Sequence, residues 1–352
     1  MNNTRLYVDL HVLQTVPPSC VNRDDTGSPK TAVYGGATRA RVSSQAWKRA
    51  MRLYFRQLFA EEDIGVRTKK VADMVAAEIA AIAPAADARK LAVEALGQAN
   101  VKLDAKSDES GALFFMSQAQ AKALARLAAE GCKDKKLYQQ AAKSGPSYDM
   151  ALFGRMVASD PSLNYDAAAQ VAHSISTHAV HNEYDYFTAV DDCETVGAGH
   201  LGTVEFNSAT LYRYATVNVR ELAALLGADA ASVVRGFAEA FLCSMPTGKQ
   251  NTFANRTRPD AVYITVRTDQ PVNLCGAFEK PVRGQDGYVD VSIERLAAYA
   301  GETYRSGYVD KPALALAIHE KLAPLATVLP LPALLDTLER DLQARLAAGT
   351  GE

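Results

Sequence analysis

An alanine-rich stretch from residue 61 to residue 145 constrains the fold most, because it separates segments that alternate between strand-like and helix-like patterns. It carries Lys and Glu throughout, and it predicts several helices that form a separate lobe. Residues 5–13, before it, alternate apolar and polar side chains as a strand does. Residues 205–219 and 260–268, after it, are rich in β-branched and aromatic residues and also predict strands. The chain therefore predicts an α+β core with a helical insertion.

Two further helices are expected outside the insertion. Residues 220–244 have a helical pattern that Gly227 interrupts. In residues 43–58, either Ser43 or Ser44 offers a capping hydroxyl. The apolar positions of this second helix form one stripe: Trp47, Ala50, Met51, Tyr54 and Leu58. Without the insertion, the order of elements is compatible with a ferredoxin-like or RNA-recognition-type core, although other α+β arrangements remain open.

The composition excludes several classes of protein. The 352 residues are 48% hydrophobic and 22% charged, without an apolar run near twenty residues, which indicates a globular protein larger than one ordinary domain. The first residues do not resemble a signal peptide, so a cytoplasmic location is expected. The five cysteines lack CxxC spacing, which favours reduced thiols and predicts no metal site.

Positive charge is concentrated between residues 19 and 52, although the whole chain has a formal net charge of -2. Only Asp24 and Asp25 oppose it there. A cluster of positive charge on a loop and at the start of a helix is suited to bind the backbone of a polyanion. The alternative interpretation is a basic helix face that is merely solvated. The basic residues of the segment are Arg23, Lys30, Arg39, Arg41, Lys48, Arg49 and Arg52.

A second cationic segment covers residues 245–259 and contains no acid. Its basic residues are Lys249, Arg256 and Arg258. The Gly-Lys pair lacks the earlier Gly of a phosphate-binding Walker loop, so ATP binding is not expected. Lys249 with Gln250 and Asn251 could instead bind phosphate or ribose oxygens, and a surface loop without a partner is the alternative.

Several blocks of the sequence carry a resemblance to a known family. They occur in one order along most of the chain, and they resemble successive blocks of the CasC family, the repeated backbone subunit of the type I-E CRISPR complex called Cascade. The blocks are HVLQTVPPSCVNRDDTGSPKTAVYGGATRARVSSQAWKRA (11–50), FGRMVAS (153–159), VAHSISTHAV (171–180), DYFTAVDD (185–192), GAGHLGTVEFNSATLYRYATVNV (197–219) and MPTGKQNTFA (245–254).

The resemblance implies a right-hand-shaped fold. Members of the family have a ferredoxin-like or RNA-recognition-type palm, a helical finger domain and a protruding thumb hairpin. Mapped onto this chain, the palm begins at residues 1–60, the finger takes 61–145, the palm continues through 146–190, the thumb takes 191–216, and the rest of the palm with a C-terminal helix takes 217–352.

The resemblance also implies a function. The chain would hold the guide RNA (crRNA) by its backbone, polymerise head-to-tail with copies of itself, join other Cascade subunits and present bases to target DNA. It would not be an enzyme, and no cofactor, metal or membrane contact is expected. The expected RNA-binding residues are Asn22, Arg23, Lys30, Arg41, Ser43, Gln45, Lys48, Arg49, Arg52, Lys249 and Gln250. Relatives have further basic residues at positions that are here Ala37, Thr38 and Asn251.

The thumb would wedge apolar side chains beside displaced bases. The candidates for this role are Leu201 and Phe206, with His200 nearby and Met156 in support. Each of these could instead be an ordinary core residue. The glycines of GAGHLG (197–202) are interpreted as a flexible tip.

Three alternatives follow from other residues. Asp24 and Asp25 could bind a divalent metal and cleave RNA, as in the related type III backbone subunits. The GAGHLG sequence matches a dinucleotide-binding pattern, but a strand-like run follows it where that pattern requires a helix. The three histidines between residues 173 and 181 lack metal-ligand spacing and are expected to be structural.

Overall fold

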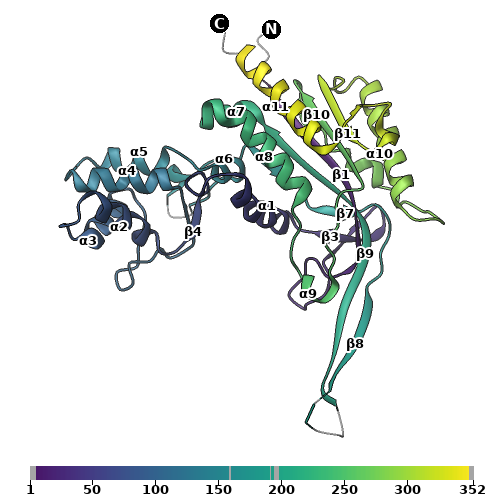
Figure 1. Ribbon diagram of the computed structural model, residues 1–352, viewed down its shortest axis with the longest axis horizontal. Helices are drawn as coiled ribbons and strands as arrows, with labels where there is room; N and C mark the ends of the chain where they lie inside the picture. The colour runs from purple at the N-terminus through teal and green to yellow at the C-terminus, as the bar shows by residue number, and fades with distance from the viewer. Residues whose placement is uncertain (1–4, 158–159, 191, 194–197, 349–352) are drawn as a thin grey trace. The chain divides into compact units, whose positions relative to one another are not determined.

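The structure, a computed structural model, describes residues 5–157, 160–190, 192–193 and 198–348 (Figure 1). It divides into two compact units, which we describe separately. Helices α1 (Ser44–Leu58) and α8 (Ala230–Cys243) each cross the division. Unit 1 comprises Met1–Tyr54, Val171–Asn218 and Val234–Glu352, and unit 2 comprises Phe55–Gln170 and Val219–Val233.

A mixed sheet forms the centre of unit 1. Its strand order is β12-β11-β10-β1-β9-β7-β3-β2. β1 lies in the middle, paired antiparallel with both β10 and β9, whereas β11 and β12 are a parallel pair. The strands are β1 (Tyr7–Ser19), β2 (Thr31–Tyr34), β3 (Ala37–Val42), β7 (Ser174–Ser176), β9 (Ala198–Asn218), β10 (Ala261–Arg267), β11 (Leu314–Ile318) and β12 (Thr327–Val328), with the short β6 (Ala169–Val171) off this path.

Both faces of β1 are buried, although its alternating sequence is typical of a strand with one solvated face. Asp9 accepts a hydrogen bond of 3.0 Å from the hydroxyl of Tyr214. His11 lies 2.9 Å through Nδ1 from the hydroxyl of Tyr212. Burial raises the pKa of Asp9 to about 6 and lowers the pKa of His11 to about 3. The polar residues of the predicted strand are thus part of the interior, where the tyrosines satisfy them.

Helices cover the sheet of unit 1. Leu296 of α10 and Phe278 pack with the rings of Tyr212 and Tyr263 in one apolar cluster. Figure 1 shows α10 beside the β10 and β11 end of the sheet. Besides α1 and α8, the helices of this unit are α9 (Gln250–Phe253), α10 (Val289–Arg305) and α11 (Leu331–Ala348), with 3-10 turns η4 (Leu274–Phe278) and η5 (Glu320–Leu322).

A long hairpin extends from the same sheet (Figure 1). It is formed by β8 (Glu183–Val190) and the first half of β9. The pairing runs from Glu183 opposite Phe206 to Val190 opposite Ala198. Every residue of β8 is exposed, so the hairpin has no core of its own.

Unit 2 is a helical lobe around its own apolar core. Val75, Leu96, Leu124 and Tyr138 are buried together there. The elements of this unit are η1 (Glu61–Asp63), β4 (Val66–Thr68), α2 (Val71–Ile82), α3 (Ala88–Gln98), β5 (Phe114–Met116), α4 (Gln118–Ala129), α5 (Lys135–Lys143), α6 (Tyr148–Phe153), η2 (Pro161–Leu163), α7 (Val219–Leu226) and η3 (Gly227–Asp229).

The structure confirms the α+β class, the predicted strands and the interruption of a helix at Gly227. In α1 the buried stripe differs from the prediction, because Phe55 is fully buried whereas Tyr54 and Leu58 are only partly covered. No helix among the described residues is long and apolar enough to cross a membrane. The ferredoxin-like arrangement of the palm stays a prediction.

Candidate nucleic-acid interface

The loop from Cys20 to Lys30 is ordered by its own aspartate. Asp24 Oδ1 accepts hydrogen bonds from the Thr26 hydroxyl at 2.7 Å and from the amides of Thr26 and Ser28 at 2.9 and 3.0 Å. The hydrogen bond from the Thr26 hydroxyl is the main cause that lowers the pKa of Asp24. Arg23 and Asp25 are exposed on this turn. Asp24 therefore acts as the structural centre of the loop.

Asn22 joins this loop to the start of α1. Its Oδ1 accepts a hydrogen bond of 2.9 Å from the amide of Ser43, and its carbonyl accepts one of 2.9 Å from the amide of Lys30. Ser43 is buried, and its Oγ accepts from the amide of Ala46 at 3.4 Å, so it caps the helix as predicted. Asn22 and Ser43, both predicted to bind RNA, thus position the loop and the helix relative to each other.

The exposed start of α1 carries the next predicted residues. Gln45 and Arg49 are exposed, and Lys48 and Arg52 are partly exposed. Lys48 and Arg52 lie one helical turn apart, as their spacing of four predicts.

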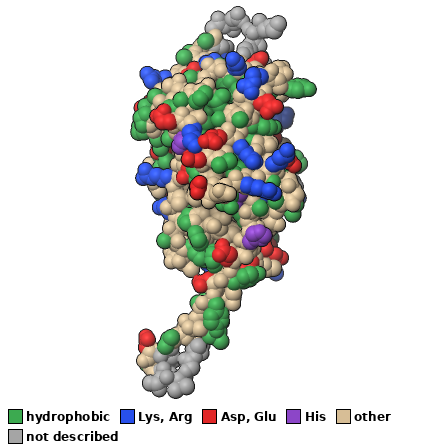
Figure 2. Space-filling view, turned by 90° about the vertical axis from the view of Figure 1, so that its right-hand side faces the viewer, with side chains coloured by type: hydrophobic (Ala, Val, Ile, Leu, Met, Phe, Trp, Pro, Cys, Tyr) green, Lys and Arg blue, Asp and Glu red, His purple; other side chains and the backbone are tan. Residues whose placement is uncertain are grey.

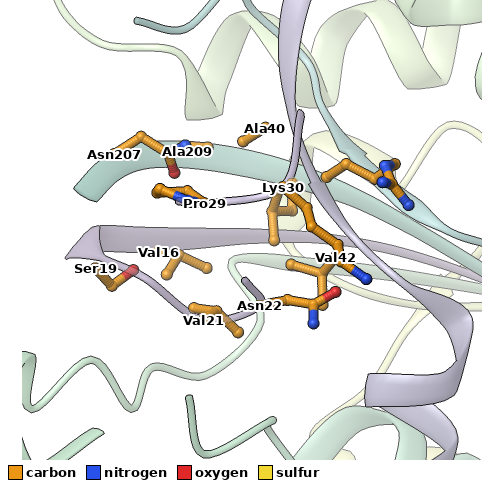
Figure 3. Close-up of a pocket in the computed structure, with 12 residues that line it drawn as sticks. Val16, Ser19, Val21, Asn22, Pro29, Lys30, Ala40, Val42, Asn207 and Ala209 are labelled. Atoms are coloured by element: carbon orange, nitrogen blue, oxygen red, sulfur yellow. The ribbon is translucent and has the colours of Figure 1, made fainter. Parts of the chain in front are cut away.

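A small hollow lies under the loop, between β1, β3 and β9. Its walls include apolar side chains such as Val16 and Val42, and its polar lining includes Asn22, Lys30 and Arg41. Figure 3 shows the ends of the Lys30 and Asn22 side chains on the same side of this hollow. Lys30 and Arg41, two of the predicted RNA-binding cations, therefore line the same hollow.

The second cationic loop packs directly on the first. A Cβ at Gly248 would lie 2.0 Å from the carbonyl oxygen of Val21, so only glycine permits this approach. Burial raises the pKa of the Cys20 thiol, and the charges of Arg23 and Lys249 oppose that shift, so both cations lie near Cys20. Gln250 begins α9, directly after Lys249. Residues more than two hundred positions apart are thus joined in one surface.

We call this region the basic surface. It combines the Cys20–Lys30 loop with the three elements that contact or adjoin it: β3, the start of α1 and the Gly248–Gln250 segment. Its cations are Arg23, Lys30, Arg41, Lys48, Arg49, Arg52 and Lys249.

Arg39 does not belong to the basic surface, although it was counted in the predicted cluster. Its side chain is fully buried, and its guanidinium donates to the carbonyl oxygens of Ser176, Phe278 and Glu279 at 2.8 to 3.1 Å. Desolvation lowers its pKa. The predicted cationic segment therefore loses one of its seven basic residues to the interior.

The hairpin has two different faces. Residues directly opposite each other in an antiparallel pair share one face. The register therefore places Tyr184, Tyr186 and Leu201 on one face, with exposed fractions of 67%, 65% and 56%, together with Glu205, which lies opposite Tyr184. The opposite face carries Glu183, Asp185, Phe187, His200, Val204 and Phe206. The predicted thumb residues are thus divided between the faces.

Phe206 and Met156, two of the predicted thumb residues, have different surroundings. Phe206 lies at the root of the hairpin, and its ring packs on Phe253 at a centroid distance of 5.7 Å. Met156 is 87% exposed and belongs to unit 2.

Gly202 is not a tip residue, which corrects that part of the prediction. It lies in β9, and a Cβ there would come within 2.3 Å of the Phe187 ring. No helix follows GAGHLG before Val219, so the dinucleotide-binding context is missing. Gly197 of this sequence lies outside the described residues.

The hairpin contains no Lys or Arg. Between residues 181 and 212 the sequence has six acidic residues and no basic one. Figure 2 shows one face of the hairpin at the lower end of the view, where apolar and acidic side chains are visible. Sequence reasoning missed Tyr184 and Tyr186, although their alternation in EYDYF was a visible signal for one strand face.

The histidines have separate environments. His178 is buried, accepts from the amide of Thr210 at 3.1 Å and stacks on Tyr288, as expected of a structural histidine. His181 is exposed. His173 is exposed and lies 3.1 Å through Nδ1 from Nη1 of Arg41.

Comparisons with known proteins give a consistent result. Residues 8–336 match the family described as CT1975-like protein. One similar solved chain comes from a structure of a "CRISPR RNA-guided surveillance complex, pre-nicking", with 34% identity, 96% of this chain and 100% of that chain covered, and a TM-score of 0.79. Another comes from a "CRISPR RNA-guided surveillance complex", with 32% identity, coverage of 95% and 99%, and a TM-score of 0.64. A search of curated proteins found no match.

Proposed function

Because the chain belongs to the family of CT1975-like proteins, a family of Cas proteins, we propose that it is the subunit of a CRISPR surveillance complex that binds the guide RNA by its backbone. The two similar solved chains are parts of RNA-guided complexes, and this chain covers nearly all of each. This likeness supports a place in such a complex. The more specific assignment to the type I-E CasC branch rests on the sequence blocks that resemble that branch.

One observation carries the proposed RNA contact: the close packing of Gly248 against Val21. It brings Lys249 to the loop of Arg23 and Lys30, so cations from separate parts of the sequence face solvent together. Among the described residues, no carboxylate forms an ion pair with Arg23, Lys30 or Lys249. Unpaired cations on an ordered loop are typical of a surface that binds a polyanion. A merely solvated surface usually mixes positive and negative side chains.

The mechanism follows from the chemistry of the surface. Its cationic and amide side chains contact phosphate and ribose oxygens, which are the same for every sequence. Binding is therefore independent of the spacer sequence, and the bases stay available for pairing with target DNA. The hairpin face with Tyr184, Tyr186 and Leu201 contributes stacking against bases, which is tolerant of sequence.

Association with further subunits is part of the proposal. A guide longer than one basic surface needs several copies in a head-to-tail array, because each copy advances along the RNA. The hairpin of one copy would contact RNA held by the next copy, and other subunits of the complex would complete the ends. The near-neutral net charge of -2 keeps repulsion between neighbouring copies small.

We propose no catalytic role for this chain. In the alternative, Asp24 and Asp25 hold a metal that cleaves RNA. Oδ1 of Asp24 already accepts three hydrogen bonds inside its own loop, which favours a structural role for this residue. Incubation of the purified protein with labelled RNA and Mg²⁺ should yield no cleavage. Cleavage that disappears in Asp25→Ala would establish the nuclease instead.

Purification from the native host, followed by sequencing of any bound RNA, tests the proposal. We expect transcripts of uniform length that share repeat-derived ends and differ in their central sequence. RNA of random length and origin, or the absence of RNA at low salt, would contradict it.

A further inference from the structure

Arg41 is held from two sides at the edge of the basic surface. Its Nε donates a hydrogen bond of 3.0 Å to the carbonyl of Thr31, and its Nη1 lies 3.1 Å from Nδ1 of His173. Arginine has only donors, so Nδ1 of His173 must be the acceptor in this contact. The imidazole is then neutral and carries its proton on Nε2. His173 is exposed, so Nε2 is accessible for a ligand.

The charges around His173 favour the same neutral form. Burial, followed by the charges of Arg41 and Lys30, lowers its pKa. Lys30 is close in the fold because its carbonyl accepts a hydrogen bond of 2.9 Å from the amide of Arg41. Among the described residues, neither Lys30 nor Arg41 pairs with a carboxylate. The cations Lys30 and Arg41 and the neutral donor His173 thus lie close together without a carboxylate partner among the described residues.

We propose that His173, Arg41 and Lys30 form one phosphate-binding subsite for the RNA backbone, with His173 as a neutral donor through Nε2–H. His173 has two functions in this subsite: its Nδ1 orients the guanidinium of Arg41, and its Nε2–H binds a phosphate oxygen. Lys30 and Arg41 supply the charge. The inference rests on the proposed RNA binding, because it names a further residue of that site.

A neutral donor and a cation have different signatures in a binding experiment. A cation that contacts a phosphate releases a counter-ion, so its removal makes log K less dependent on log salt, by about 0.7 per contact on a single strand. A neutral imidazole releases none. His173→Ala should therefore lower RNA affinity about tenfold with an unchanged salt slope, because a hydrogen bond to a charged group is lost. Arg41→Ala should lower both affinity and slope.

The test uses the full chain, a single-stranded RNA and titrations at several salt concentrations. His173→Gln should restore much of the lost affinity, because its side-chain amide retains a donor at the position of Nε2. His181→Ala, which removes an exposed histidine outside the subsite, should bind as the wild type does. Long-range ¹H–¹⁵N spectra should show the Nε2–H tautomer for His173, with its Nε2 signal shifted by RNA.

The outcomes separate this subsite from the proposed function. Failure of the wild type to bind RNA in a salt-dependent manner would overturn the proposed function. Two results would overturn only the subsite with its neutral donor. One is that His173→Ala binds RNA as tightly as the wild type does. The other is that the salt slope of His173→Ala is shallower by about 0.7. If His173→Ala does not fold, the RNA affinity of His173→Gln and the tautomer spectrum of the wild type test the subsite instead. An Nδ1–H tautomer of His173 would contradict the proposal.

Discussion

The basic surface and the β8–β9 hairpin belong to the same unit, yet they differ in charge and in support. The loops of the basic surface are fixed by hydrogen bonds of Asn22 and Asp24 and by the close approach of Gly248. The hairpin has eight exposed residues in β8 and no cation along its length. Electrostatic attraction to a polyanion can therefore arise only at the first region, whereas the second can contribute stacking. The comparison predicts that counter-ion release, and with it most of the salt dependence of RNA binding, belongs to the basic surface.

The largest effect is expected for the triple substitution of Arg23, Lys30 and Lys249 by Ala. Three phosphate contacts are lost, so RNA affinity should fall about a hundredfold or more, at about 1 kcal/mol or more per contact. The salt slope should become shallower by about 2, at about 0.7 per contact. Titrations with two unrelated spacer sequences measure both quantities.

The matched control for this change is Arg340→Ala, which removes an exposed arginine whose hydrogen bonds stay within its own helix. It should leave affinity and slope unchanged. A triple variant whose losses differ strongly between the two spacers would contradict backbone recognition and would remove the distinction between the two regions.

Gly248→Ala should have the next largest effect, because it separates the two cationic loops. The new Cβ would lie 2.0 Å from a backbone oxygen, which cannot rotate away. Overpacking of this kind costs about 1–3 kcal/mol, so we expect about a tenfold loss of RNA affinity as Lys249 moves from Arg23. Binding titrations and thermal melting check it.

Gly202→Ala is the corresponding change in the hairpin. There the new Cβ meets the ring of Phe187, a side chain that can turn outward. Affinity should change little, with a fold change well below that of Gly248→Ala. Equal losses in the two glycine variants would show that the loops of the basic surface are not the more rigid region.

Tyr184→Ala combined with Tyr186→Ala tests the hairpin by itself. Stacking of a base on an aromatic ring contributes about 1–3 kcal/mol, so removal of this face should lower RNA affinity about tenfold. The salt slope should stay the same, because no counter-ion is involved. The two measured quantities thus separate stacking from charge, and a shallower slope would show that the two tyrosines also support cationic contacts to the RNA made elsewhere in the protein.

Much of this organisation could be predicted from the sequence. The strand around Leu10, the capped helix after Ser43 and the interruption at Gly227 follow from local patterns, and the structure confirms them. The excess of positive charge between residues 19 and 52 also predicted the loop and helix that form most of the basic surface. Local periodicity and capping are encoded within a few neighbouring residues, which explains this success.

The exceptions depend on partners that are distant in the sequence. Arg39 and Arg41 lie two residues apart in β3, yet Arg39 is buried because carbonyls of Ser176 and Phe278 surround it. Nothing in the local sequence distinguishes the two arginines. The faces of the hairpin likewise require the register of β8 against β9, since a shift by one residue would exchange them.

The smallest expected effect concerns Asp185 in the hairpin. Asp185 is exposed there, on the face opposite Tyr184 and Tyr186. If the tyrosines face the RNA, Asp185 lies about 10 Å or more from the nearest phosphate, where repulsion in water is about 0.4 kcal/mol. Asp185→Asn should therefore raise affinity about twofold at low salt, and the gain should disappear at physiological salt, where the screening length is about 8 Å. Asp286→Asn, an exposed acid outside the hairpin, is the control. A decrease in affinity for Asp185→Asn would instead mean that this carboxylate contacts a cation, and the hairpin would then contribute charge as well as stacking.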